Sequence, residues 1–73
     1  MTSVELFDSI KTKLPDADIN IIDTVGDQDH YKVSISSSYF NGLSMLQQHR
    51  LVYEALGEKL KFLHALSLET FIK

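Results

Sequence analysis

The feature that most constrains the fold of this 73-residue chain is an alternating stretch at residues 30–37, HYKVSISS. Tyr31, Val33 and Ile35 are apolar, and polar side chains separate them. Side chains of a β-strand point alternately to opposite faces of a sheet, so this pattern predicts a strand with one covered and one exposed face. The fold is therefore expected to contain a sheet that helices cover on one side only.

A second strand is predicted directly before this one, over Ala17–Val25. Ala17, Ile19 and Ile21 would lie on one of its faces. The four residues between the two runs, Gly26–Asp29, contain no apolar side chain. A short polar connection between two such runs predicts an antiparallel hairpin.

A third strand is predicted over Leu63–Thr70, where Leu66 and Leu68 alternate with small or polar residues. His64 has the same parity as these two leucines. It is therefore expected at the start of the strand, toward the covered side of the sheet.

A helix is predicted over Thr2–Leu14. Thr2 and Glu5 have the spacing of a capping box, and Pro15 ends the helix. Its core-facing stripe is expected to consist of Val4, Phe7, Ile10 and Leu14.

A longer helix is predicted from Ser44 to about Lys61, with Ser44 and Gln47 as a second capping box. Gly57 is interpreted as a glycine tolerated inside this helix. A separate short helical turn is possible before it, at Tyr39–Leu43. The apolar stripe is expected to contain Met45, Val52, Leu56 and Leu60, with His49 and Tyr53 lying within it.

The predicted order is helix, strand, strand, helix, strand. This order favours an α+β fold with a three-stranded mixed sheet and helices on one face. The length predicts a single small domain over residues 1–73.

Composition and motifs exclude several functional classes. The chain has no cysteine, which excludes a thiolate zinc site or an autonomous four-thiolate iron–sulfur site. We find no phosphate-binding loop, nucleophile elbow or dinucleotide fingerprint, so an enzyme is not expected. There is no apolar run of membrane-spanning length and no signal-peptide pattern, so we expect a soluble cytoplasmic protein with no membrane partner.

The three histidines remain as candidates for chemistry. His49 lies within the apolar stripe, where it is expected to pack and donate one hydrogen bond. His30 and His64 both belong to strand starts, which a three-stranded sheet could bring together. Neutral imidazoles ligate iron or zinc, but two ligands do not complete a site, so the remaining ligands would come from a partner. The alternative is a small structural subunit without ligand chemistry.

Three motifs give a resemblance to a known family. They are F-x-G-x-S at Phe40–Ser44, H-R-x-V-Y at His49–Tyr53 and H-A-L-S-L at His64–Leu68. Their order and spacing resemble the BolA-like family, and the strand start His30–Val33 also fits. The resemblance covers nearly the whole chain and implies a fold similar to the class II KH arrangement.

The resemblance also implies a partner, a monothiol glutaredoxin, with or without a bridging 2Fe–2S cluster. In such complexes the glutaredoxin cysteine and glutathione hold one iron. The BolA-like partner supplies a C-terminal histidine, which maps onto His64, and a second ligand from the loop between the first two strands. In this chain His30 is the candidate in that region, and His49 stays open as an alternative.

The sequence departs from the family pattern at three places. The loop between the first two strands is short, the T-P-x-x-W segment after the last strand is missing, and Gln48 stands where arginine is common. Whether the isolated chain is a monomer or a weak homodimer is left open.

The competing interpretation is a nucleic-acid-binding transcriptional regulator that uses the KH-like fold. The net charge of −3 does not favour it, because phosphate binding depends on Lys and Arg. There is no G-x-x-G loop to clamp a nucleic-acid backbone. The basic residues Arg50, Lys59 and Lys61 are also interspersed with acidic ones.

Overall fold

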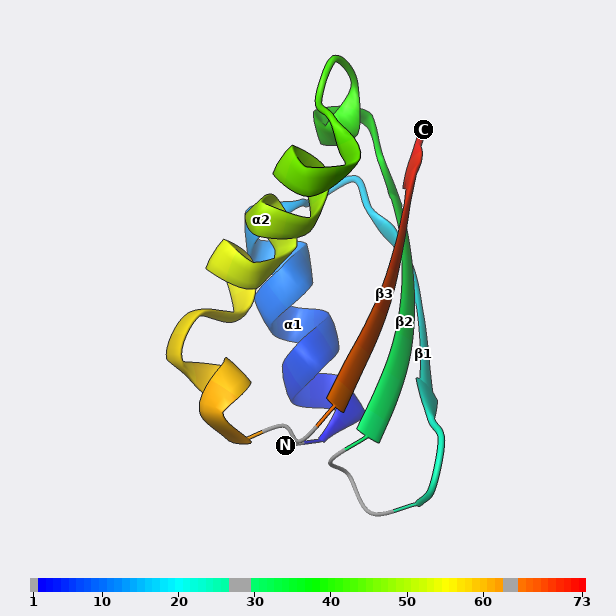
Figure 1. Cartoon of the computed structure of the whole chain (residues 1–73), viewed down its shortest axis with the longest axis vertical. Helices are drawn as coiled ribbons and strands as arrows, with labels where there is room; N and C mark the ends of the chain where they lie inside the picture. Colours follow the sequence, from blue (N-terminus) through cyan, green and yellow to red (C-terminus); the bar gives the residue numbers. More distant parts are fainter. Residues whose placement is uncertain (1, 27–29, 63–64) are drawn as a thin grey trace.

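The computed structural model describes residues 2–26, 30–62 and 65–73, and it has one sheet with two helices on one face (Figure 1). The elements, in chain order, are α1 (Ser3–Lys13), β1 (Asp18–Asp23), β2 (His30–Ser37), the 3₁₀ segment η1 (Ser38–Phe40), α2 (Met45–Leu56), the 3₁₀ segment η2 (Gly57–Phe62) and β3 (Ala65–Ile72). The predicted α+β class and order of elements are confirmed.

The sheet has the strand order β1-β2-β3. β1 and β2 form the predicted antiparallel hairpin, whereas β3 pairs with β2 in parallel. Parallel neighbours need a long crossover connection, and the segment that contains α2 supplies it. The helices consequently cover one face of a mixed sheet, and the opposite face is open in Figure 1.

The core lies between the sheet and the two helices. Its buried apolar residues are Leu6, Ile10, Leu14, Ala17, Tyr31, Val33, Ile35, Phe40, Val52 and Leu56. The three apolar residues of β2 are all among them, as the alternation predicts. Across the described ranges, none of the helices combines the length and apolar character that a membrane crossing requires.

The predicted apolar stripe of α1 is partly wrong. Leu6 and Ile10 are buried, but Val4 is 66% exposed and Phe7 is 40% exposed. Leu6, Ile10 and Leu14 recur every four residues, which is as typical of a helix face as the predicted spacing. α1 therefore packs by its Leu6 side, and Val4 and Phe7 lie at the edge of the sheet beside β1.

The second helix ends earlier than predicted. α2 stops at Leu56, and Gly57 caps it with φ +55° and ψ −131°, its N–H donating to the carbonyl of Tyr53. Glycine adopts this conformation without the steric cost that a Cβ adds. Gly57 is thus the residue that turns the chain out of α2 into η2, and its interpretation as a tolerated helix glycine was wrong.

The face that α2 turns to the core also differs from prediction. Gln48 is buried beside Val52 and Leu56, whereas Met45 is 59% exposed. β3 ends at Ile72, two residues beyond its predicted end. The predicted first two residues of this strand, Leu63 and His64, lie outside the described residues.

Replacing Gly57 by alanine is expected to lower the free energy of unfolding by about 1–3 kcal/mol. A Cβ at this position meets no atom within 4 Å, so the loss comes from backbone strain alone. Urea denaturation of the variant and the parent measures it. The adjacent exposed substitution Glu58→Ala is the control, expected within about 0.5 kcal/mol of the parent; equal losses for the two variants would contradict the assigned backbone conformation.

Candidate functional site

The pairing of β2 with β3 brings the first residues of the two strands together. His30, the first residue of β2, is paired with Ala65, the first residue of β3. Ala65 directly follows His64 in the sequence. The prediction for His64 itself lies outside the described residues. The sheet register thus places His30 beside the chain neighbour of the second candidate ligand.

His30 is half-buried at the beginning of β2. Tyr31 is buried and Lys32 is exposed, so the alternation places His30 on the uncovered face of the sheet with Lys32. The His30 carbonyl accepts hydrogen bonds from the Thr24 amide at 3.0 Å and the Thr24 hydroxyl at 3.1 Å. These bonds fix the backbone of His30 at the end of the hairpin.

His49 lies far from the strand starts. Gln48, its neighbour, accepts a hydrogen bond on Oε1 from the Thr70 hydroxyl at 2.6 Å, and its Nε2 donates to the Leu43 carbonyl at 3.0 Å. Thr70 is five residues beyond Ala65, which is about 16 Å along a strand. The beginning of α2, with His49, is therefore beside the end of β3 rather than its start.

His49 is half-buried, as the stripe of α2 predicts, but it does not make the expected hydrogen bond through Nε2. This atom is buried and has no hydrogen-bond partner among the residues that the structure describes. Polar contacts between α2 and β3 are made instead by Gln48 and by Met45, whose Sδ accepts from the Thr70 hydroxyl at 3.4 Å.

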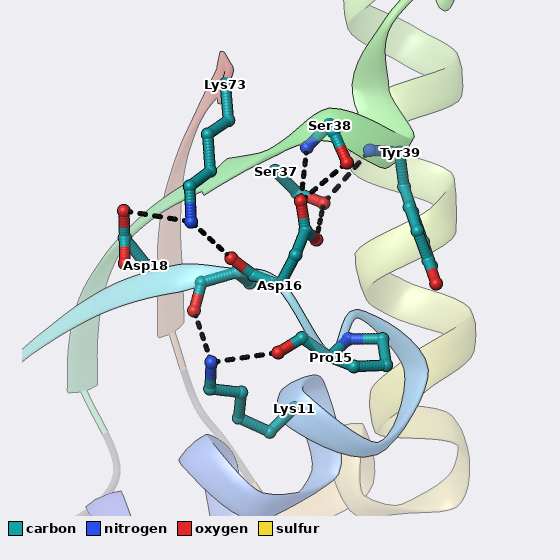
Figure 2. A network of polar contacts seen from close by, with 9 residues as sticks. Lys11, Pro15, Asp16, Asp18, Ser37, Ser38, Tyr39 and Lys73 are labelled. Atoms are coloured by element: carbon teal, nitrogen blue, oxygen red, sulfur yellow. Dashed lines mark hydrogen bonds and ion pairs between the residues drawn. The ribbon is translucent and has the colours of Figure 1, made fainter.

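A polar network centred on Asp16 joins the other end of the sheet (Figure 2). Its carboxylate accepts hydrogen bonds from the Ser38 hydroxyl at 2.6 Å, the Ser38 amide at 2.8 Å and the Ser37 hydroxyl at 2.7 Å. These bonds, led by that of the Ser38 hydroxyl, hold the pKa of Asp16 well below its ordinary value of 3.8, because they favour the ionised form. Lys73 donates to the Asp16 carbonyl at 2.6 Å and pairs with Asp18 at 3.3 Å.

The Asp16 network connects the start of β1 to the end of β2 and the end of β3. Its partners are 21 to 57 residues from Asp16 along the chain, so sequence reasoning missed it. The adjacent hydroxyl residues Ser37 and Ser38 are the one local sequence signal for polar contacts there. The network is structural, and it holds the three strands in register at the end opposite His30.

Removing the Asp16 carboxylate is expected to destabilise the protein at neutral pH and to matter less in acid. A depressed native pKa contributes stability that is present above the ordinary pKa of 3.8 and is lost as the pH falls toward the native value. The difference in urea midpoint between Asp16→Ala and the parent should therefore narrow from neutral pH to about pH 3. Asp18→Ala, which removes only an exposed ion pair, is the control; a difference for Asp16→Ala that does not change with pH would contradict this account.

The donor set at the strand-start end is incomplete for a metal centre. Within residues 2–26, 30–62 and 65–73, no group of three or more His, Cys, Asp or Glu side chains is arranged to hold a metal ion. His30 is the one histidine described at this end of the sheet, where it is half-buried, and the chain has no thiolate. A metal centre at this end would therefore need ligands beyond the residues that the structure describes.

Comparison with known proteins identifies the family. A family model described as BolA-like protein matches residues 8–73. The chain is similar to protein RP812 of Rickettsia prowazekii, with 48% identity over 71 residues that span 96% of this chain and 92% of that protein. The structure of BolA1 from Arabidopsis thaliana is also similar, with a TM-score of 0.85 and 31% identity over 96% of this chain and 89% of that one.

Other curated relatives are longer than the region they share with this chain. The DNA-binding transcriptional regulator BolA of Escherichia coli is 40% identical over 47 residues, which span 63% of this chain and 45% of that protein. For BolA-like protein 1 of Homo sapiens, the 45 matched residues span 33% of the relative. The family model and the Rickettsia relative each match most of this chain. The chain therefore belongs to the BolA-like family.

Proposed function

We propose that this protein binds a monothiol glutaredoxin and helps to ligate a bridging 2Fe–2S cluster, in iron–sulfur cluster assembly, trafficking or iron sensing. The observation that supports the proposal is the pairing of His30 with Ala65 at the start of β2 and β3. His64 precedes Ala65 in the sequence, so the proposal assigns both candidate imidazoles to this end of the sheet, in a chain without thiolates.

Strand alternation assigns His30 and His64 to opposite faces, so in the proposed complex the two bind one iron at the end of the sheet, as neutral imidazoles. The glutaredoxin cysteine and glutathione bind the other iron. His49 is not proposed as a ligand, because α2 places it beside the end of β3 that is remote from Ala65. Ligation of one iron by histidine raises the reduction potential of the cluster above that of a four-thiolate cluster, as in Rieske centres.

Visible absorption and circular dichroism test this proposal. A monothiol glutaredoxin that carries a glutathione-ligated 2Fe–2S cluster is titrated with the parent protein. We expect the spectrum to change until the two proteins are present in equal amounts, because two of the cluster's ligands change from sulfur to nitrogen. An unchanged spectrum, together with no complex in gel filtration, would contradict the proposal.

The alternative is DNA binding, which the printed name of the Escherichia coli relative suggests. The basic residues of α2 and η2, which would contact phosphates, are Arg50, Lys59 and Lys61. In the chain alone, the Lys59 ammonium group donates a hydrogen bond to the Ser9 hydroxyl at 2.7 Å. If these three residues made the phosphate contacts, a fourfold rise in salt would weaken binding by about 40-fold. Fluorescence anisotropy with a DNA duplex at several salt concentrations measures this dependence. A dissociation constant that does not change with salt concentration would exclude DNA binding through these residues.

A further inference from the structure

The edge of β1 is incompletely covered. Among the described residues β1 pairs only with β2, so its other edge presents backbone hydrogen-bonding groups. Ile19 and Ile21 point to the helix-covered face, yet both are only half-buried. With Ser3, Val4 and Phe7 of α1 they line an open pocket of about 270 Å³. An apolar groove thus runs beside an open strand edge.

We propose that this groove binds a second copy of the chain, with the two β1 strands antiparallel about a two-fold axis at Asn20. In this register each Asn20 lies opposite its counterpart, and Ile19 lies opposite Ile21 of the second copy. Residues directly opposite in an antiparallel pair share a face of the sheet. The arrangement would join two three-stranded sheets into one six-stranded sheet with all four helices on the same face.

The groove side chains are self-complementary in this arrangement. The axis brings two pairs of Ile19 and Ile21 together on the covered face, and it sets the two α1 helices next to each other above them. Val4 and Phe7, exposed in the single chain, then face the same side chains of the second copy. Burial of this apolar surface is the driving force. On the uncovered face the Asn20 amides have both donors and acceptors to offer each other.

The charges at the ends of the strand are also complementary in this register. Lys11 donates to the Ala17 carbonyl at 2.7 Å and to the Pro15 carbonyl at 3.1 Å, so its ammonium group lies over Ala17. The register sets Asp23 of the second copy opposite Ala17, on the same face. Asp23 already accepts from the Gly26 amide at 3.0 Å, and a carboxylate accepts several hydrogen bonds. Two symmetric pairs of Lys11 with Asp23 result, and no two like charges lie directly opposite.

Sedimentation equilibrium of the protein alone, from micromolar to millimolar concentration, tests the proposal. We expect a monomer–dimer equilibrium in the parent. Asn20→Lys and Asn20→Asp each place like charges at the two-fold axis and should weaken the dimer about tenfold or more. Asn20 is exposed on the uncovered face, so both variants should keep the far-ultraviolet circular dichroism of the parent. An equal mixture of the two variants should recover the dimer.

Phe71→Lys is the matched control. It adds a positive charge to an exposed residue of the other edge strand, β3, and should leave the dimer unchanged. A parent that stays monomeric at millimolar concentration would overturn the proposal. So would a dimer that Phe71→Lys weakens and Asn20→Lys does not. The experiment contains neither glutaredoxin nor iron, so its outcome is independent of the proposed function.

Discussion

Replacing Phe40 by alanine is expected to lower the free energy of unfolding by about 3–5 kcal/mol. Phe40 is fully buried in η1, where its ring belongs to the core between the sheet and the helices. Truncation removes the buried ring and leaves a cavity that the surrounding elements fill only in part. A domain of this size is marginal, and domains in general have only about 5–15 kcal/mol of stability, so this variant should be largely unfolded at modest urea concentration.

The neighbouring aromatic residue provides the control for this prediction. Tyr39 lies in the same 3₁₀ segment but is 50% exposed, so Tyr39→Ala is expected to cost less than about 1 kcal/mol. Urea denaturation followed by circular dichroism compares both variants with the parent. Similar losses for the two variants would show that η1 does not anchor the core through Phe40.

Replacing His64 by alanine is expected to abolish the spectral change that the parent protein produces with the cluster-loaded glutaredoxin. The cluster would lose one of two ligands that this chain supplies. His30→Ala should alter the spectrum as well, because it removes the second imidazole from the same iron. Visible circular dichroism at equal amounts of the two proteins measures both effects. Full retention of the spectral change in His64→Ala would contradict the ligand assignment.

Two further variants test whether the spectral effect comes from an iron ligand at residue 64 and not from the loss of any histidine. His49→Gln changes a histidine beside the other end of β3 and should keep the parent spectrum. His64→Cys should restore cluster binding but lower its reduction potential, since a thiolate replaces an imidazole. A potential that is the same for His64→Cys and the parent would mean that residue 64 does not bind iron.

Much of the fold could be predicted from local sequence signals. The alternation at residues 30–37 located β2 with its bounds, and the polar turn before it predicted the antiparallel hairpin. Both capping boxes, Thr2 with Glu5 and Ser44 with Gln47, are present. These features depend on residues within a few positions of each other, so tertiary contacts did not override them.

The errors arose where tertiary packing decides between equally good local patterns. Either face of α1 has apolar residues at helical spacing, and packing against α2 and the sheet selected Leu6 over Val4 and Phe7. Gln48 is polar and was not expected in the interior, yet its buried side chain donates a hydrogen bond to the Leu43 carbonyl and accepts one from the Thr70 hydroxyl. Such hydrogen bonds between distant segments leave no periodic signal in the sequence.

The candidate site was predictable only in part. Their positions at strand starts and the resemblance identified His30 and His64 as candidates, and the parallel register of β2 and β3 supplied the pairing of His30 with Ala65. The sequence left His49 open as a ligand, because it does not show which part of β3 the helix α2 lies beside. The contact between Gln48 and Thr70 shows that the beginning of α2 lies beside the end of β3. That contact is a tertiary one, 22 residues apart along the chain.

The most direct test of the central claim is pulsed electron paramagnetic resonance of the reduced complex. This protein is prepared with ¹⁵N-labelled histidine, and the glutaredoxin is left unlabelled. We expect strong ¹⁵N couplings to the cluster from directly bound imidazoles, with the contribution of one histidine lost in His30→Ala. A reduced cluster in a stable complex that shows no histidine nitrogen coupling would contradict the claim that this chain ligates the shared cluster.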